Sequence, residues 1–365
     1  MAAPRIIFSI FNDPNYDQRM IRIAGSLQAA GYDVLLVGAG YAGTGPLIEK
    51  PYRQRRFNMV FSKGKARYIE FNCRLFFFLL FQKADLVCAI DLDSIVPVYW
   101  VSRLKNSKRV YDAHEWFSEM KEVVSRPHIH RLWKWVEKKY VPRFPQGYTV
   151  NAPIADAFKQ LYGVDYPAIR NMPLLSADTP TPAKEDFLLY QGAVNEGRAF
   201  ELLIPAMKWV EKPLYIYGDG NFRQQAAALI REHAQEQKVF LQGKVLPEQL
   251  RQITTRALLG FTLFEATGKS NYYSLANRFF DYVQAGVPQI AVDFPAYKDL
   301  NKDAPVAVLV TLTDPEALAR IINNTVNDQE NYRQLFSNCL LKRKEWNWEK
   351  ESEILLDFYQ KLLPI

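Results

Sequence analysis

Short runs of β-branched and aromatic residues alternate along the first half of the chain with stretches whose apolar residues recur at helical spacing. The apolar runs lie at residues 5–11, 33–40, 84–91 and 108–114, and an amphipathic stretch at 16–31 separates the first two. Strand patterns that alternate with helical patterns are typical of βαβ units on a parallel sheet. The first half is therefore predicted to be a Rossmann-like domain.

The same alternation starts again in the second half. The predicted strands lie at 186–192, 213–220, 238–245, 257–264 and 288–294, with helices ending near Val210, spanning 224–235, around Phe279 and following Asp314. Asp314, Pro315 and Glu316 have the order of a capping residue, a proline at the first helical position and an acid in the first turn. We therefore predict a second Rossmann-like domain.

A proline-rich polar segment at 176–183 has no periodicity and separates the two halves. The predicted fold is α/β, with two Rossmann-like domains, 1–175 and 184–345, that face each other across a cleft. Residues 346–365 are predicted to form a C-terminal helix that crosses back onto the first domain. Its apolar stripe consists of Ile354, Leu355, Phe358, Tyr359 and Leu362.

Composition and charge narrow the class of protein. The chain has 365 residues, 48% of them hydrophobic, which is enough for two cores. Residues 1–172 carry 25 Lys and Arg against 15 Asp and Glu, whereas the remainder carry 21 against 24. The basic first half suggests an anionic partner, either a membrane surface or an acidic acceptor. Nucleic acid is not expected, because the basic residues lie on separate segments without a reading motif.

Three scattered cysteines indicate neither a disulfide framework nor a metal site and fit a reducing compartment. The N-terminal residues lack the order of a signal peptide, and the apolar run at 75–81 is too short to span a bilayer. We therefore expect a cytoplasmic protein, with peripheral contact to the cytoplasmic face of the inner membrane as a further option.

Several motifs are set aside. Gly38–Gly43 has the GxGxxG spacing, but it follows the second predicted strand and precedes prolines rather than a helix, so we interpret it as a glycine-rich loop. Asp91 and Asp93 form a DxD pattern without a third ligand nearby in the sequence, and no metal is predicted. His128 and His130 lie in a basic, aromatic helix, 127–140, which is either a solvated helix with a buried stripe or an interfacial helix on anionic lipid.

Two groups of residues point to a site. In the first half, Asp112, His114 and Glu115 come after the strand residues 108–111, at the edge where parallel sheets expose their ligand crevice. In the second half, glycines lie at the ends of two predicted strands, at Gly192 and at Gly218 and Gly220. Arg198 lies near the start of the next helix. Glycine turns let a phosphate approach backbone amides, and arginine adds a fixed cation.

The segment 271–288 is the densest in candidate residues. Small polar residues lead into a helix with Arg278 near its start and Asp281 almost one turn later, and the helix is predicted to stop at Gly286. Amides at this helix start, near Ser274 and Leu275, suit a diphosphate. The donor-binding candidates of the second half are Gly192, Gly218, Gly220, Asn271, Ser274, Leu275, Asn277 and Asp281.

In this order and spacing, the segments 12–34, 111–119, 190–198, 215–220 and 274–290 resemble the retaining glycosyltransferases of the GT-B fold, family 4. The resemblance implies that the second domain binds a nucleotide sugar, UDP- or GDP-linked, and the first binds the acceptor. It places Arg198 and Arg278 at phosphate-binding positions, Asp281 at the ribose and His114 near the donor sugar. Asp17, Arg19, Asp112 and Glu115 are assigned to the acceptor.

The implied reaction is hexosyl transfer with retention and without a metal or other cofactor, to a glycan, a lipid-linked glycan or a small molecule, in polysaccharide biosynthesis. His114, Arg198 and Arg278 are the predicted catalytic residues, the two arginines as cations that stabilise the leaving diphosphate. Tyr273 and Ala193 stand where the family has an acid and an arginine. Two alternatives therefore stay open, a nucleotide-sugar epimerase of the same fold and a non-catalytic nucleotide-sugar binding protein.

Overall fold

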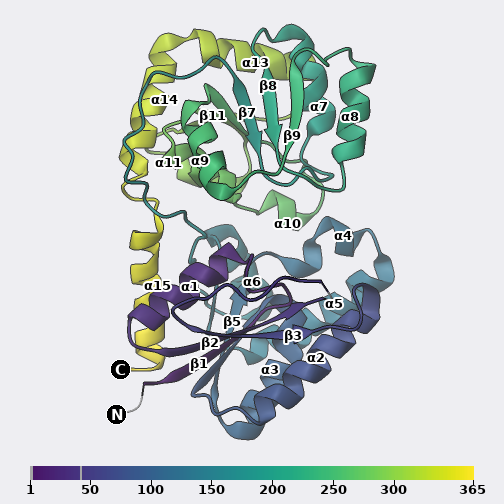
Figure 1. Ribbon diagram of the computed structural model, residues 1–365, viewed down its shortest axis with the longest axis vertical. Coiled ribbons are helices and arrows are strands. Elements are labelled where there is room, and N and C mark those ends of the chain that lie inside the picture. Colours follow the sequence, from purple (N-terminus) through teal and green to yellow (C-terminus); the bar gives the residue numbers. More distant parts are fainter. Residues whose placement is uncertain (1–2, 42) are drawn as a thin grey trace. The chain divides into compact units, whose positions relative to one another are not determined.

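The computed structural model describes residues 3–41 and 43–365, and the chain forms two compact units (Figure 1). Unit 1 runs to Asn171 and resumes at Glu349, and unit 2 comprises Met172–Trp348. The proline-rich segment 176–183 is part of unit 2. The Arg343 side chain donates hydrogen bonds to the backbone oxygens of Ser176 and Asp178, at 2.8 and 2.9 Å.

The sheet of unit 1 is parallel throughout its six strands, in the order β3-β2-β1-β4-β5-β6. Its central strands are buried on both faces, as expected for a sheet covered by helices on each side. The strands are β1 (Arg5–Ser9), β2 (Asp33–Gly40), β3 (Arg53–Asn58), β4 (Leu86–Ile90), β5 (Lys108–Ala113) and β6 (Gly147–Thr149).

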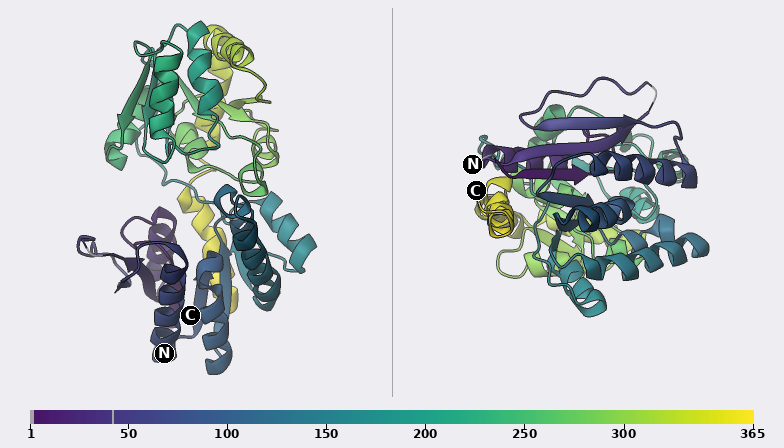
Figure 2. Two further views of the ribbon diagram at one scale, coloured as in Figure 1. Left: turned by 90° about the vertical axis from the view of Figure 1, so that its right-hand side faces the viewer. Right: turned by 90° about the horizontal axis from the view of Figure 1, so that it is seen from below.

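Three helices of unit 1, α2, α3 and α5, pack side by side (Figures 1 and 2). The helix α6 is capped at Asn151, whose side chain accepts from the Ile154 amide at 2.9 Å, and it ends at Gly163 with φ +69°. The helices are α1 (Gln18–Ala29), α2 (Gly64–Leu80), α3 (Asp91–Lys105), α4 (Lys121–Val124), α5 (Pro127–Tyr140) and α6 (Ala152–Tyr162), with short 3-10 turns at Phe117–Glu119 and Val141–Arg143.

The C-terminal helix α15 (Trp348–Leu362) belongs to unit 1, as predicted. Tyr359 is fully buried, and its hydroxyl lies 3.2 Å from that of Tyr148 on β6. Glu351 accepts from the backbone and side chain of Arg170, at 2.6 and 2.8 Å. The predicted apolar stripe is wrong at one position, because Ile354 is 44% exposed. It lies one position before the buried Leu355 and so points away from the sheet.

Unit 2 repeats the strand order of unit 1, with a parallel sheet ordered β12-β11-β10-β7-β8-β9. Counted along each unit, both orders read 3-2-1-4-5-6, the order of a doubly wound Rossmann sheet. The predicted α/β fold with two Rossmann-like domains is therefore confirmed. The strands are β7 (Leu188–Gln191), β8 (Leu214–Tyr217), β9 (Val239–Gly243), β10 (Leu259–Thr262), β11 (Gln289–Val292) and β12 (Ala307–Val310).

Two helix boundaries of unit 2, the start of α13 and the end of α11, follow the signals in the sequence. Asp314 caps α13 by accepting from the Ala317 amide at 2.8 Å, and α11 is followed by Gly286 with φ +60°. The helices are α7 (Phe200–Ala206), extended by a 3-10 turn at Met207–Trp209, α8 (Arg223–Glu232), α9 (Pro247–Arg256), α10 (Lys269–Tyr272), α11 (Asn277–Gln284), α12 (Pro295–Leu300), α13 (Pro315–Asn327) and α14 (Gln329–Lys342).

The glycine-rich run 38–43 differs from its predicted form. Gly38 and Gly40 are the last residues of β2 rather than loop residues, and Ala42 lies outside the described residues. A Cβ at Gly38 would lie 2.6 Å from the Asn12 backbone oxygen, so close packing against the β1–α1 loop explains the glycine. Residues 44–50 are irregular, so no helix follows the glycines. The run therefore lacks the helix that a dinucleotide-binding motif requires. Among the helices of the described residues, none combines the length and apolar character needed to cross a bilayer.

Candidate functional site

Two glycine turns lie against each other at the carboxyl edge of the unit 2 sheet. Gly192 follows β7 with φ +121°, and Gly218 follows β8 with φ +149°. A Cβ at Gly218 would lie 1.7 Å from the Gly192 backbone oxygen, and one at Gly220 would lie 2.1 Å from Asn195 Oδ1. Only glycine fits at these positions, so the backbones of the two turns contact each other directly at the ends of β7 and β8.

Arg278, at the second position of α11, lies directly beside the first of these turns. Its Nη1 donates to the Tyr190 hydroxyl at 2.7 Å and to the Gln191 backbone oxygen at 3.2 Å. A Cβ at Gly192 would lie 3.0 Å from the same nitrogen. The side chain of Arg278 is only 7% exposed, and its Nε is buried without a hydrogen-bond partner among the described residues. A buried cation therefore lies at the end of β7.

The two arginines predicted from the sequence meet at one aromatic ring. The guanidinium carbons of Arg198 and Arg278 lie 4.4 and 4.8 Å from the centroid of Phe264, which follows β10. Tyr297, on α12, is also close to them: burial raises the pKa of its hydroxyl, while the charges of Arg278 and Arg198 act in the opposite direction. The structure therefore brings both cations to the same edge of the unit 2 sheet.

Asp281 lies one turn after Arg278 on α11. Its carboxylate accepts from Gln191 Nε2 at 3.3 Å, so it also faces the end of β7. The loop before α11 is fixed by the Tyr297 hydroxyl, which accepts from the Ala276 amide at 3.0 Å. Asn277 is the first residue of α11, and Leu275 packs partly buried against the core of unit 2.

The predicted role of the amide at Ser274 needs a correction. This amide donates to the Asn271 backbone oxygen at 3.1 Å, and the Ser274 hydroxyl does so at 2.8 Å. Both groups close the turn after α10, so the amide is used inside the chain rather than presented to a ligand. The physical reason is that α10 ends at Tyr272 and the chain makes a separate turn before α11 begins at Asn277.

Unit 1 holds a second cluster, at the ends of β4 and β5. Asp112 is fully buried and accepts from Arg19 Nη2 at 3.0 Å and from His114 Nε2 at 3.0 Å. The His114 backbone amide donates to Asp91 Oδ1 at 2.9 Å, and Nδ1 of its ring lies 3.9 Å from Asp91 Oδ2. Arg19 also donates to the Ile169 backbone oxygen at 2.8 Å. Both nitrogens of the His114 ring therefore face carboxylates.

These contacts fix the charge of the His114 ring. Burial would lower the pKa of His114, but the negative charge of Asp112 and the hydrogen bond to it raise this pKa to about 9. Burial would raise the pKa of Asp112, and the charges of Arg19 and His114 lower it. At neutral pH, His114 is an imidazolium that can stabilise negative charge and cannot serve as a base.

The residues assigned to the acceptor occupy different environments. Arg19 and Asp112 are buried and form an ion pair with each other at 3.0 Å. Asp17 caps α1 by accepting from the Met20 amide at 3.0 Å. Glu115 is half-buried and follows His114 directly. Acceptor binding by these four residues stays a prediction.

Known proteins of this architecture identify the fold. Sucrose-phosphate synthase from Thermosynechococcus elongatus is similar over 99% of this chain and 99% of its own, at 17% sequence identity and a TM-score of 0.81. The chain has the GT-B fold. Anabaena HepE, in complex with UDP and glucose, is similar over 98% of this chain and 100% of its own, at 14% identity and a TM-score of 0.76.

A third GT-B structure, a glycosyltransferase from Rickettsia africae, is similar over 100% of both chains, at 11% identity and a TM-score of 0.74. Residues 172–339 match the family model described as glycosyl transferases group 1. This span lies within unit 2 and contains both glycine turns, both arginines and Asp281. No curated protein sequence matches the chain.

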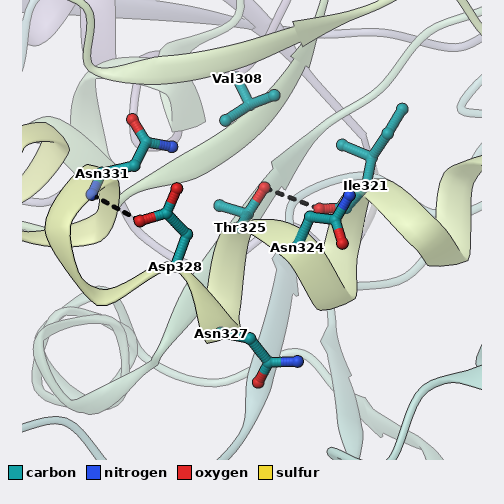
Figure 3. A pocket seen from close by; sticks show the side chains of 7 residues that line it. All are labelled: Val308, Ile321, Asn324, Thr325, Asn327, Asp328 and Asn331. Carbon is teal, nitrogen blue, oxygen red and sulfur yellow. Dashed lines mark hydrogen bonds between the residues drawn. The ribbon is translucent and has the colours of Figure 1, made fainter.

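A different surface of unit 2 carries the depression shown in Figure 3, which is lined by Val308, Ile321, Asn324, Thr325, Asn327, Asp328 and Asn331. Its polar side chains form hydrogen bonds at the end of α13 and the start of α14. Asp328 accepts from the Asn331 amide at 3.0 Å, and the Thr325 hydroxyl donates to the Ile321 backbone oxygen at 2.7 Å. The depression therefore lies at the junction of α13 and α14, and these polar groups are used within the chain.

Sequence reasoning missed several residues that surround the two candidate clusters. Phe264 and Tyr190 contact the guanidinium groups, and Tyr297 lies close enough for the charges of both arginines to act on its hydroxyl. As isolated aromatic residues, all three resemble core residues in the sequence. Asp91 was set aside with Asp93 as a weak DxD pattern. Its position at the end of β4, next to β5, was the signal that could have linked it to His114. No group of three or more His, Cys, Asp or Glu placed to hold a metal occurs within residues 3–41 and 43–365.

Proposed function

We propose that this chain is a glycosyltransferase whose unit 2 binds the diphosphate of a nucleotide sugar. The observation that carries the proposal is the convergence of Arg198 and Arg278 on Phe264, beside the glycine turns at the end of β7 and β8. The family model that matches residues 172–339 and the GT-B fold support the same activity. HepE, a neighbour in fold, has been seen with UDP and with UDP-glucose.

The chemistry assigned to the arginines follows from the charge that develops in the reaction. When the bond between the sugar and the diphosphate breaks, negative charge grows on the leaving phosphate oxygens, and fixed cations in a partly buried site stabilise it. Arg278 is held by Tyr190 and Gln191 before any substrate binds, so little reorganisation is needed.

The finer assignments belong to the same proposal. The reaction proceeds with retention, as in family 4, without a metal, and transfers a hexose from a UDP or GDP donor to a glycan, lipid-linked or small-molecule acceptor. Asp281 faces the end of β7 and accepts from a ribose hydroxyl, and the imidazolium of His114 supplies positive charge in unit 1. A cytoplasmic location and a role in polysaccharide biosynthesis complete the proposal.

A donor screen tests this function directly. Isothermal titration calorimetry with UDP, GDP, UDP-glucose and GDP-mannose in the presence of EDTA should show binding to one nucleotide class, and binding should fall in Arg198→Met and Arg278→Met. Dependence of binding on an added divalent metal would contradict the metal-free site.

Turnover separates the alternatives. Release of UDP or GDP that requires an added acceptor supports glycosyl transfer. Isomerisation of the donor without an acceptor would indicate an epimerase, and tight binding without any turnover would indicate a binding protein. The binding-protein alternative is tested because Tyr273 stands where the resemblance expects an acid.

A further inference from the structure

Unit 1 exposes several large apolar side chains on three adjacent helices, α2, α3 and α5. The exposed fractions are 61% for Phe77, 44% for Trp100, 65% for Leu104, 50% for Leu132 and 54% for Trp135. The opposite sides of these helices supply buried residues to the core of unit 1. We call this outward surface of α2, α3 and α5 the basic-apolar face (Figures 1 and 2).

Aromatic rings run continuously from α3 to α5 beneath this face. Trp100 lies 5.3 Å from Tyr99, Tyr99 lies 5.4 Å from Tyr140, and Tyr140 lies 6.5 Å from Trp135, measured between ring centroids. The Lys139 ammonium lies 4.5 Å from the centroid of Trp135. Because the inner rings are buried, the two exposed tryptophans are held on a rigid base.

Charge on the basic-apolar face has one sign. Arg103, Lys105, Arg131 and Lys138 are exposed on α3 and α5. No Asp or Glu is exposed on α2, α3 or α5, all of whose residues the structure describes. The one acid on α5, Glu137, is fully buried and accepts from Ser118, Lys134 and Tyr162.

We propose that the basic-apolar face docks on an anionic phospholipid surface. Tryptophan and leucine side chains reach the boundary between headgroups and acyl chains, while lysine and arginine bind phosphate headgroups at the same level. The basic-apolar face carries both apolar and basic side chains, and therefore matches a membrane surface in which phosphate headgroups lie above acyl chains. Four of the exposed basic residues in the first half of the chain lie on α3 and α5 of this face.

A protein partner fits these observations less well. The buried centre of a protein interface is depleted in lysine, whereas cations and apolar side chains alternate across this face. An acidic partner would account for the cations but not for tryptophans that are half exposed. The proposal does not rest on the transfer reaction, because vesicle binding is measured without donor or acceptor.

Co-sedimentation with vesicles tests the proposal on the whole chain. The protein should bind vesicles of phosphatidylcholine with 30% phosphatidylglycerol at low salt, and should bind pure phosphatidylcholine and high-salt samples weakly. Arg131→Glu/Lys138→Glu should weaken the partition coefficient at least about 25-fold, since each basic residue near an anionic surface contributes about fivefold. Trp100→Ser should weaken it several-fold.

Matched variants in unit 2 serve as controls. Trp209 is 44% exposed, as Trp100 is, so Trp209→Ser removes an equally exposed tryptophan away from the face. Lys208→Glu/Arg231→Glu makes the same change in charge on exposed residues of unit 2. Both controls should bind vesicles as the unchanged protein does. Thermal melts and UDP or GDP binding report whether each variant is folded.

Three results would overturn the proposal. The first is absence of binding to anionic vesicles at low salt. The second is equal weakening by the face variants and by their unit 2 controls, which would indicate a general effect of net charge. The third is a dimer of the unchanged protein, seen by light scattering without lipid, that dissociates in Trp100→Ser, since the face would then be covered by a second copy.

Discussion

Replacement of Arg278 by methionine isolates the charge on which the proposed function depends. Methionine keeps an unbranched apolar stem against Tyr190 and Phe264, whose ring centroids lie 4.6 and 4.8 Å from the guanidinium carbon, and removes the cation. Loss of one donor to the charge that develops in a transition state typically lowers kcat by about 10²–10³, or about 3–4 kcal/mol. We expect Arg278→Met to lower the rate of nucleotide release by that factor.

The same change also removes two hydrogen bonds, to the Tyr190 hydroxyl and the Gln191 backbone oxygen. Their loss costs about 1–3 kcal/mol of stability. For a unit of this size, each kcal/mol lowers Tm by about 2–4 °C. The variant should therefore stay folded at 25 °C, and its melting curve shows whether the rate was measured on native protein.

Arg343 offers a matched control. It is also 7% exposed and also donates two hydrogen bonds, to the backbone oxygens of Ser176 and Asp178. Arg343→Met should lower Tm by a similar amount and leave the rate within about threefold of the unchanged protein. If Arg278→Met keeps the full rate, or if both variants lose the rate equally, the leaving-group role of Arg278 is refuted.

Four further predictions concern the two clusters. The imidazole signal of His114, followed by NMR, should titrate near pH 9, and Asp112→Asn should move it toward 6.5. The folded pKa lies above the unfolded value, so the stability from His114 is complete below about pH 6.5 and is lost as pH rises through about 9; unchanged unfolding free energy over that window would contradict this. Gly218→Ala should lower Tm and abolish nucleotide binding, whereas Gly25→Ala, with nothing within 4 Å of its Cβ, should do neither. Arg19→Met should destabilise unit 1 by about 3–5 kcal/mol in chemical denaturation, and the double variant with Asp112→Asn should recover part of the loss.

Much of the candidate site could be predicted because it follows strand ends. Gly192, Gly218 and His114 each come directly after a strand, and the carboxyl ends of parallel strands meet at one edge of a sheet. The partners of these residues could not be predicted in the same way. Asp91 and His114 are 23 positions apart and meet because β4 and β5 pair in register, with Ile90 beside Asp112.

The amide of Ser274 shows where local reasoning fails. Its residue type and position favour a helix start open to a phosphate, yet the chain closes a turn there and the Tyr297 hydroxyl accepts from the Ala276 amide. The exposed tryptophans show the same limit, since amphipathic spacing does not tell which aromatic residues on α3 and α5 are covered.

The sequence by itself determined the local order of this protein: alternating strand and helix patterns, capped helix starts, glycines where backbone must approach backbone, and an excess of basic residues in the first half. These properties depend on neighbours along the chain, so single-chain patterns encode them. Only the tertiary structure decided that Arg198 and Arg278 share Phe264, and that two carboxylates enclose His114. Such contacts join residues tens of positions apart, and their distances follow from strand order and packing rather than from spacing in the sequence.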